Sequence, residues 1–234
     1  MPLNHDQFNK KVLDFAKDIG EALSCFHEHS WSGEITAADP DSERLRAVLD
    51  AKLDLRTHNG SQDGTLAVFS VIYKLCVDSY GDHLAVEHSS FVLKAKVDRT
   101  PIIRWDYDRE AYGKPSSHVQ MTAHRGALSH LLSRLDHENP HSIESLHMPM
   151  GGDRFRPCLE DIVEFLIRDC GFKGGADWRE SLRSGRAKWR RIQTRAVVRD
   201  APAEAADQLS KMGYTVTPPN GGHPEERTDR LKAW

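Results

Sequence analysis

The sequence predicts an α+β fold in which helices pack on an antiparallel meander of about five strands, with a small α/β appendage at the C-terminal end. Three observations support this prediction. The middle of the chain alternates apolar and polar residues with the period of a strand. Turn residues such as Asn59-Gly60 and Asp63-Gly64 separate these runs, and amphipathic helical patterns stand on both sides of them.

The first expected element is an amphipathic helix from Asp6 to about Phe26. Its apolar side chains recur every three to four residues, with charged residues on the other side, and they are Phe8, Val12, Phe15, Ile19 and Leu23. A loop follows it. Pro40-Asp41-Ser42 then predicts the start of a short helix that runs through Leu49.

The strands of the meander are expected where β-branched and aromatic residues alternate with polar ones. Turn chemistry bounds each of these runs, as at Ser79-Tyr80-Gly81-Asp82. The five runs are residues 52–56, 66–77, 85–97, 102–107 and 117–121. Short strands with tight connections predict an antiparallel sheet.

Two helices are expected after the sheet, over residues 126–136 and 159–170. The second has a strong apolar stripe, acidic residues in its first turn and Gly171 as its stop. It should pack on the sheet. Residues 147–152 are expected to form a loop or a short edge strand.

The C-terminal part is predicted to be separate from the core. Residues 171–175 resemble a hinge, and residues 176–217 show a strand candidate at 197–198, a helix over 203–212 and a second strand over 214–217. We therefore predict a core domain over 1–170, a basic accessory subdomain over 176–217 and a flexible tail over 218–234.

Composition limits the class of protein. Hydrophobic residues make up 38% of the 234 residues and charged residues 29%, as in globular chains. No apolar run approaches the ~20 residues that span a bilayer, and the N-terminus lacks a secretory signal. We predict a cytoplasmic protein without a membrane partner. The cysteines, which lack CxxC spacing, should be buried free thiols; they are Cys25, Cys76, Cys158 and Cys170.

The strand over residues 102–107 carries the first candidate for chemistry. Alternation places Arg104, Asp106 and Asp108 on one face of it. A guanidinium binds phosphate as a fork, and a neighbouring carboxylate orients it, so Arg104 and Asp106 are candidate site residues. The alternative is a solvated strand face with an internal Arg–Asp pair.

Histidines make up the second candidate. His118, Gln120 and Thr122 share a face of the next strand, and His124 joins them only if the strand runs on. Histidine can give or take a proton near neutral pH, so His118 is a candidate general acid or base, with His147 or His124 as its partner. The alternative for any one of them is a partly exposed sheet histidine.

A second interpretation is that the histidines are metal ligands. His118, His124 and His147 with an aspartate would supply a His/carboxylate set, but no HxH or HExxH spacing is present. We therefore predict no metal and no cofactor.

The segment before the helix at 159 is the third candidate. Arg154 and Arg156 flank Phe155 just ahead of a helix N-terminus, where an anion is well placed. We predict that both arginines bind nucleic acid and that, together with Arg104, they hold the scissile phosphate beside His118. The alternative is a structured turn that feeds the helix.

The net charge of −3 conceals a basic stretch between Arg179 and Arg199. Cationic side chains interleaved with tryptophan can hold a phosphate backbone and stack on bases. The alternative is a solvated helix face with Trp178 and Trp189 in the core. The predicted nucleic-acid-binding residues of this stretch are Arg183, Arg186, Lys188, Trp189, Arg190 and Arg191.

Three blocks in this order resemble the TumE-type toxin family of bacterial toxin–antitoxin systems. They are Arg104-Trp105-Asp106-Tyr107, the histidine strand from Ser117 to His124, and Pro157-Cys158-Leu159-Glu160-Asp161. The likeness covers roughly residues 53–167. The N-terminal helix is extra, and the region after Gly171 has no counterpart. The resemblance implies a toxin role and a cognate antitoxin protein as partner.

Two functions are therefore expected from the sequence. The first is a toxin-like, nucleic-acid-directed enzyme, namely a metal-independent endoribonuclease that uses histidine acid/base chemistry and binds RNA through the basic segment. The second is a non-catalytic module that binds nucleic acid or protein in phage defence or transcriptional control. In the first case His118, Arg104 and the His147 loop should converge on one site.

Overall fold

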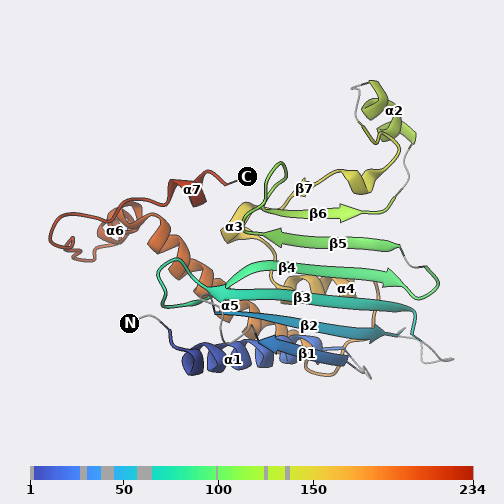
Figure 1. Ribbon diagram of the computed structural model, residues 1–234, viewed down its shortest axis with the longest axis horizontal. Helices are drawn as coiled ribbons and strands as arrows, with labels where there is room; N and C mark the ends of the chain where they lie inside the picture. Colours follow the sequence, from blue (N-terminus) through green and yellow to red (C-terminus); the bar gives the residue numbers. More distant parts are fainter. Residues whose placement is uncertain are drawn as a thin grey trace.

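The computed structural model describes residues 3–26, 31–37, 45–56, 65–98, 100–123, 126–134 and 138–233. Within these residues one antiparallel sheet has its strands in sequence order, as a meander (Figure 1). The strands are β1 (Trp31–Ala37), β2 (Arg46–Leu55), β3 (Ala67–Val77), β4 (Leu84–Ala95), β5 (Pro101–Asp108), β6 (Ser117–Met121) and β7 (Met148–Pro149). The predicted α+β class and antiparallel order are confirmed.

The sheet has seven strands in the described part of the chain, two more than expected. One addition is the edge strand β1, where residues 32–36 are all exposed, so no apolar alternation marks it in the sequence. The other strand beyond the five of the expected meander is β7, which pairs with His118 and Val119 and confirms the short edge strand that was one of the two alternatives for residues 147–152. The expected helix through Leu49 starts outside the described residues; over residues 46–49 it is wrong, because β2 begins at Arg46 and buries every second residue from Ala47 to Leu55.

Three helices cover one face of the sheet: α1 (His5–Leu23), α4 (Leu159–Arg168) and α5 (Trp178–Asp200). Their apolar side chains share one core with the strand residues that point the same way. Phe8 of α1, Val163 and Leu166 of α4, and Leu182 of α5 are almost fully buried there. The expected packing of the 159–170 helix on the sheet is confirmed, and its Phe165 ring contacts Trp105 of β5 edge-on.

The remaining elements lie around the ends of the sheet. They are α2 (Gly126–Arg134), the 3₁₀ helix η1 (Ile143–Ser145), α3 (Gly152–Phe155), α6 (Pro202–Lys211) and α7 (Thr228–Leu231). The helix α2 stands beyond the sheet at the upper right of Figure 1. Gly151 before α3 has φ 81°, a left-handed conformation that favours glycine, so the chain can turn there between β7 and α3.

The C-terminal strands expected at 197–198 and 214–217 are wrong. Val197 and Val198 belong to α5, a single helix of 23 residues, and residues 214–217 form no regular element. Trp178 and Leu182 at the start of α5 lie in the same core as the sheet, and Phe26 forms a bridge with Gly174. The C-terminal appendage is therefore helical in its described residues, and α5 is part of the helical layer.

A polar clamp joins α5 to α4. Arg186 donates through Nε to Asp161 Oδ1 at 2.6 Å and through Nη2 to Glu164 Oε2 at 2.5 Å. Gly185 lets the two helices approach, since an added Cβ would lie 2.5 Å from a Glu160 carboxylate oxygen. The Arg186 side chain is only 16% exposed, so these bonds are partly shielded from water.

Replacing Arg186 with Met is expected to lower the free energy of unfolding by about 1.5–3 kcal/mol, the contribution typical of a hydrogen bond to a charged group. The control is Arg183→Met, one turn earlier on the exposed side of α5, with an expected change within about 0.5 kcal/mol. Urea denaturation followed by circular dichroism measures both. Equal loss in the two variants would contradict the clamp.

The four cysteines are free thiols. Cys25 and Cys158 are buried as expected, whereas Cys76 is half-buried and Cys170 is exposed. Burial raises the pKa of the Cys25 thiol to about 11. Burial also raises the pKa of the Cys158 thiol, and the neighbouring Glu160 adds to that rise. Both buried thiols are therefore protonated at neutral pH and act as packing groups.

Candidate active site on the open face of the sheet

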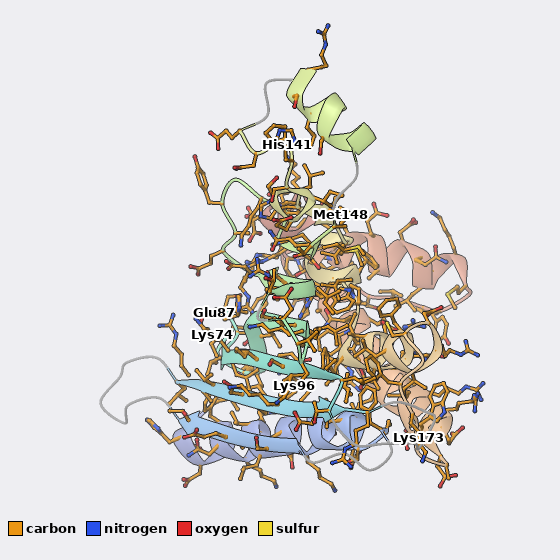
Figure 2. The ribbon with its side chains drawn as sticks, turned by 90° about the vertical axis from the view of Figure 1, so that its right-hand side faces the viewer. Lys74, Glu87, Lys96, His141, Met148 and Lys173 are labelled. Atoms are coloured by element: carbon orange, nitrogen blue, oxygen red, sulfur yellow. The ribbon has the colours of Figure 1, made fainter. Side chains whose placement is uncertain are left out.

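The face of the sheet opposite the helices carries the candidate residues in cross-strand rows. Side chains of directly paired residues in an antiparallel sheet point to the same face. Ser90 pairs with Asp106, and Asp106 pairs with His118, so these three form one row. In the next row Arg104 pairs with Gln120. In Figure 2, where the sheet is seen along its strands, Lys74 lies on this side, away from α4 and α5.

Asp106 is the centre of the site. Its Oδ1 accepts a hydrogen bond from Ser90 Oγ at 2.6 Å, and its Oδ2 lies 2.9 Å from Arg104 Nε. The carboxylate is 11% exposed, whereas the guanidinium is 42% exposed. The less exposed Asp106 therefore fixes the position of Arg104, and the Arg104 side chain remains accessible to solvent. This is the orienting role expected from the sequence.

His118 lies in the floor of the site and is 1% exposed. Its Nδ1 is 2.9 Å from the Pro115 carbonyl oxygen, which can only accept, so Nδ1 carries the proton. The Nε2 atom is therefore a lone-pair acceptor in the neutral ring, 3.8 Å from Asp106 Oδ2, with no hydrogen-bond partner among the described residues. Burial lowers the pKa of His118, partly offset by the Pro115 carbonyl and Asp106.

His147 covers His118 from the loop between η1 and β7. The two rings meet edge-on with their centroids 4.8 Å apart. Gln120 anchors this loop, since its Nε2 donates to the Glu144 carbonyl at 2.9 Å and lies 3.4 Å from His147 Nε2. Its Oε1 accepts from Arg104 Nε at 3.1 Å. Gln120 thus connects the guanidinium to the histidine loop.

His147 is half-buried, so its ring reaches solvent where that of His118 does not. Burial lowers the pKa of His147, and the nearby cations Lys114 and Arg104 lower it further. The ring is therefore neutral at pH 7 and able to accept a proton.

The sequence prediction missed a third imidazole, His88. This residue of β4 pairs with Asp108, so it lies on the same face. Burial lowers its pKa, with Lys74 adding to the effect and Asp106 opposing it. The row of His88 and Asp108 is next to the row of Ser90, Asp106 and His118 on this face, and Lys114 lowers the pKa of all three histidines. We call this set the histidine cluster; it consists of His88, Ser90, Arg104, Asp106, Lys114, His118, Gln120 and His147.

Arg154 and Arg156 do not join the histidine cluster. Arg156 stacks on the Tyr107 ring, 3.7 Å from its centroid, and Tyr107 points into the core on the helix-covered face. Arg154 pairs with the buried Asp200 at the end of α5, at 2.6 Å. The expectation that both arginines hold the scissile phosphate beside His118 is therefore wrong, because strand alternation turns Tyr107 and Asp106 to opposite faces.

The predicted nucleic-acid-binding residues of α5 divide into two groups. Arg186 is held in the clamp to α4, and Lys188 pairs with Asp18 at 2.6 Å. The Arg186 side chain is only 16% exposed and therefore has a structural role. The Lys188 side chain is 57% exposed in its ion pair, so its binding of RNA stays a prediction. The other exposed members are Arg183, Arg190 and Arg191, while Trp189 is half-buried beside Arg156, with 5.0 Å from the guanidinium to the ring centroid.

Two of the expectations concern histidine 124 and metal binding. His124 lies outside the described residues. Among the residues that the structure describes, no group of three or more His, Cys, Asp or Glu side chains is arranged to hold a metal ion.

The chain matches no protein-family model, no curated protein and no solved structure. None of the described helices combines the length and the apolar character needed to cross a membrane.

Proposed function

We propose that the histidine cluster cleaves phosphodiester bonds in RNA, and that the protein is a toxin-like endoribonuclease. The observation that supports this most is the solvent-facing guanidinium of Arg104, oriented by Asp106 and linked through Gln120 to the half-buried His147. A cation beside imidazoles combines charge stabilisation with proton transfer.

The chemistry follows from those groups. His147, neutral at pH 7, takes the proton of the 2′-hydroxyl, whose oxygen attacks the adjacent phosphorus. Arg104 stabilises the negative charge that grows on the non-bridging oxygens. His88, in its protonated form, returns a proton to the departing 5′-oxygen as the P–O bond breaks. The products are a 2′,3′-cyclic phosphate and a 5′-hydroxyl.

His118 takes a different role from the one expected from the sequence. A ring that is 1% exposed cannot contact substrate, so it is a positioning group beneath His147 rather than the general base. Its Nδ1 bond to the Pro115 carbonyl fixes the ring plane against which His147 packs.

The resemblance to TumE-type toxins supports the same proposal. Two of its three blocks supply Arg104, Asp106 and His118 to the cluster. The third, residues 157–161, starts α4 and receives the Arg186 clamp, so its contribution is structural. A cognate antitoxin is the partner that this proposal implies.

The exposed arginines of α5 would bind RNA outside the cleaved segment, since they lie on the other side of the sheet. A triple variant with Gln at 183, 190 and 191 is expected to lower the slope of log K against log salt by about 2–3, since each neutralised phosphate contributes ~0.7–0.9. Filter binding of a single-stranded RNA between 50 and 300 mM salt measures the slope. An unchanged slope would show that this side of α5 is only solvated.

The rate should depend on pH because one imidazole must be protonated and another neutral. The pKa values of His88 and His147 both lie below the ordinary value of 6.5. We therefore expect kcat/KM to fall above pH 6.5, by roughly tenfold per pH unit as the acid loses its proton. A plateau through pH 8 contradicts the assignment.

Stability needs a parallel measurement over the same pH range. A histidine whose folded pKa is lowered binds its proton more tightly in the unfolded chain. The resulting stability is fully present above pH 6.5 and is lost progressively as pH falls below it. Thermal melts at each pH separate this loss from the acidic limb of the rate profile.

Incubation of the full-length protein with a mixed-sequence RNA and excess EDTA tests the proposal. Cleavage by the parent, and none by a His147→Asn protein of equal melting temperature, is the expected result. If the parent leaves RNA intact at protein concentrations that saturate binding, the non-catalytic binding module becomes the better description. Cleavage that EDTA abolishes places metal chemistry at the site and contradicts the proposed mechanism.

A further inference from the structure

A cavity of about 430 Å³ opens on the side of the sheet opposite the histidine cluster, bordered by α1, the β3–β4 turn, α5 and the segment around α7. Nine of its described lining residues are Lys or Arg and four are Asp. This local excess of positive charge stands out in a chain whose net charge is −3. It concentrates anions at the cavity.

Some of the lining cations are neutralised by carboxylates. Arg154 pairs with Asp200, Lys188 with Asp18, and Arg227 with Asp229. Arg195 and Arg199, one turn apart on α5, form no ion pair with the residues that the structure describes. They give the cavity two cations for a ligand.

An aromatic wall bounds the cavity. The Arg156 guanidinium lies 3.7 Å from the Tyr107 ring centroid and 5.0 Å from that of Trp189. Beyond this stack lies a second hollow of about 600 Å³, which shares Arg154, Arg156, Trp189 and Gln193 with the first. Phe155 lines the second hollow and is 78% exposed, although a ring of that size is normally covered.

Gln193 lines both hollows and carries an unused hydrogen-bonding group. Its Oε1 is shut off from solvent and accepts no hydrogen bond from the described residues. A buried acceptor without a donor costs free energy, but an oxygen that is closed to water is closed to a ligand as well, so Gln193 only lines the two hollows.

We infer that the two hollows together bind a phosphorylated nucleotide. Arg195 and Arg199 contact the phosphates, and the base stacks on the aromatic side chains of Trp189 or Phe155. A cavity of 430 Å³ lies within the ~300–1,000 Å³ of small-molecule sites and is far larger than one phosphate needs. This inference does not depend on RNA cleavage, because the histidine cluster faces the other side of the sheet.

The same chemistry could come from a free nucleoside polyphosphate or from the 5′-phosphorylated end of an RNA. Isothermal titration calorimetry of the full-length protein distinguishes these two sources. The ligands are ATP, GTP, inorganic phosphate, and one six-nucleotide RNA that bears either a 5′-phosphate or a 5′-hydroxyl. Tighter binding of ATP or GTP than of both RNAs identifies the free nucleotide. A preference for the 5′-phosphorylated RNA identifies the RNA end.

The double variant Arg195→Gln/Arg199→Gln should weaken binding of the preferred ligand at least tenfold. The control, Arg183→Gln/Arg191→Gln, removes the same charge from exposed α5 positions outside both hollows and should change the Kd less than twofold. If the double variant fails to fold, Lys11→Gln is the second cavity variant, because Lys11 is an exposed residue of α1 that lines the first cavity. The inference would be overturned if the cavity and control variants weakened binding equally. It would also be overturned if inorganic phosphate bound as tightly as the nucleotides, or if no ligand bound at millimolar concentration.

Discussion

Replacing His147 with Asn is expected to reduce kcat/KM for RNA cleavage by about 100-fold or more, the usual loss when a general base is removed. Asparagine keeps a polar side chain of similar size but cannot accept a proton at neutral pH. Because His147 is only half-buried in a loop, the melting temperature should stay close to that of the parent. Single-turnover cleavage of a labelled RNA gives the rate.

His141 offers a matched control for that substitution. It lies six residues upstream on the approach to η1 and is exposed, and it has no contact to a residue of the histidine cluster among those that the structure describes. His141→Asn should cleave RNA at the parent rate. Equal rates for the two variants and the parent would remove His147 from the mechanism.

Replacing Arg104 with Met should lower kcat by about 100- to 1,000-fold, as when one preorganised donor to a developing charge is lost. Met keeps the aliphatic volume and removes the cation that is 42% exposed beside Asp106. Arg104→Lys should restore only part of the rate, since a point charge lacks the fork that reaches both Asp106 and Gln120.

Lys52→Met is the control for the Arg104 variant. Lys52 is an exposed cation on the same face of the sheet, on β2, away from the histidine cluster. Its loss should change the rate less than twofold. A similar fall in both variants would indicate that the open face contributes only general positive charge. A melt of Arg104→Met controls for the loss of its bonds to Asp106 and Gln120.

The sequence predicts the inner strands well because each buries one face. Residues 47–55, for example, alternate between buried and more exposed positions, and the apolar and polar residues alternate in the same way from Lys52 to Arg56 of the sequence. The same alternation correctly puts Arg104 with Asp106 and His118 with Gln120. The edge strand β1 has no buried face at its described positions, so it leaves no such pattern.

The rest of the site depends on the register in which the strands pair, and the residue pattern of a single strand does not reveal that register. His88 and Ser90 reach Asp106 and Asp108 only because β4 pairs with β5 in one particular alignment, after an irregularity in the β3–β4 pairing between Lys74 and Leu75. Nothing local to β4 distinguishes His88 from an ordinary strand histidine.

The predictions for three arginines were wrong for a similar reason, since their partners lie far from them in the chain. Arg154, Arg156 and Arg186 were all expected to bind nucleic acid, because arginine next to an aromatic residue or in a basic run is typical of such surfaces. Their partners Asp200, Tyr107 and Asp161 are far away in the chain. Charge density in a sequence cannot separate a cation that is paired inside the fold from one that faces solvent.

The most direct test of the proposed RNA cleavage is the chemical structure of the product ends. Two RNAs are incubated with the protein and EDTA: an all-ribose RNA, and the same RNA with a single 2′-deoxy nucleotide at a mapped cleavage position. Mass spectrometry then gives the masses of the products. We predict 2′,3′-cyclic phosphate ends from the all-ribose RNA, no cleavage at the deoxy position, and no products from His147→Asn. Cleavage at the deoxy position, or 5′-phosphate ends, would contradict attack by the 2′-hydroxyl and with it the role of the histidine cluster.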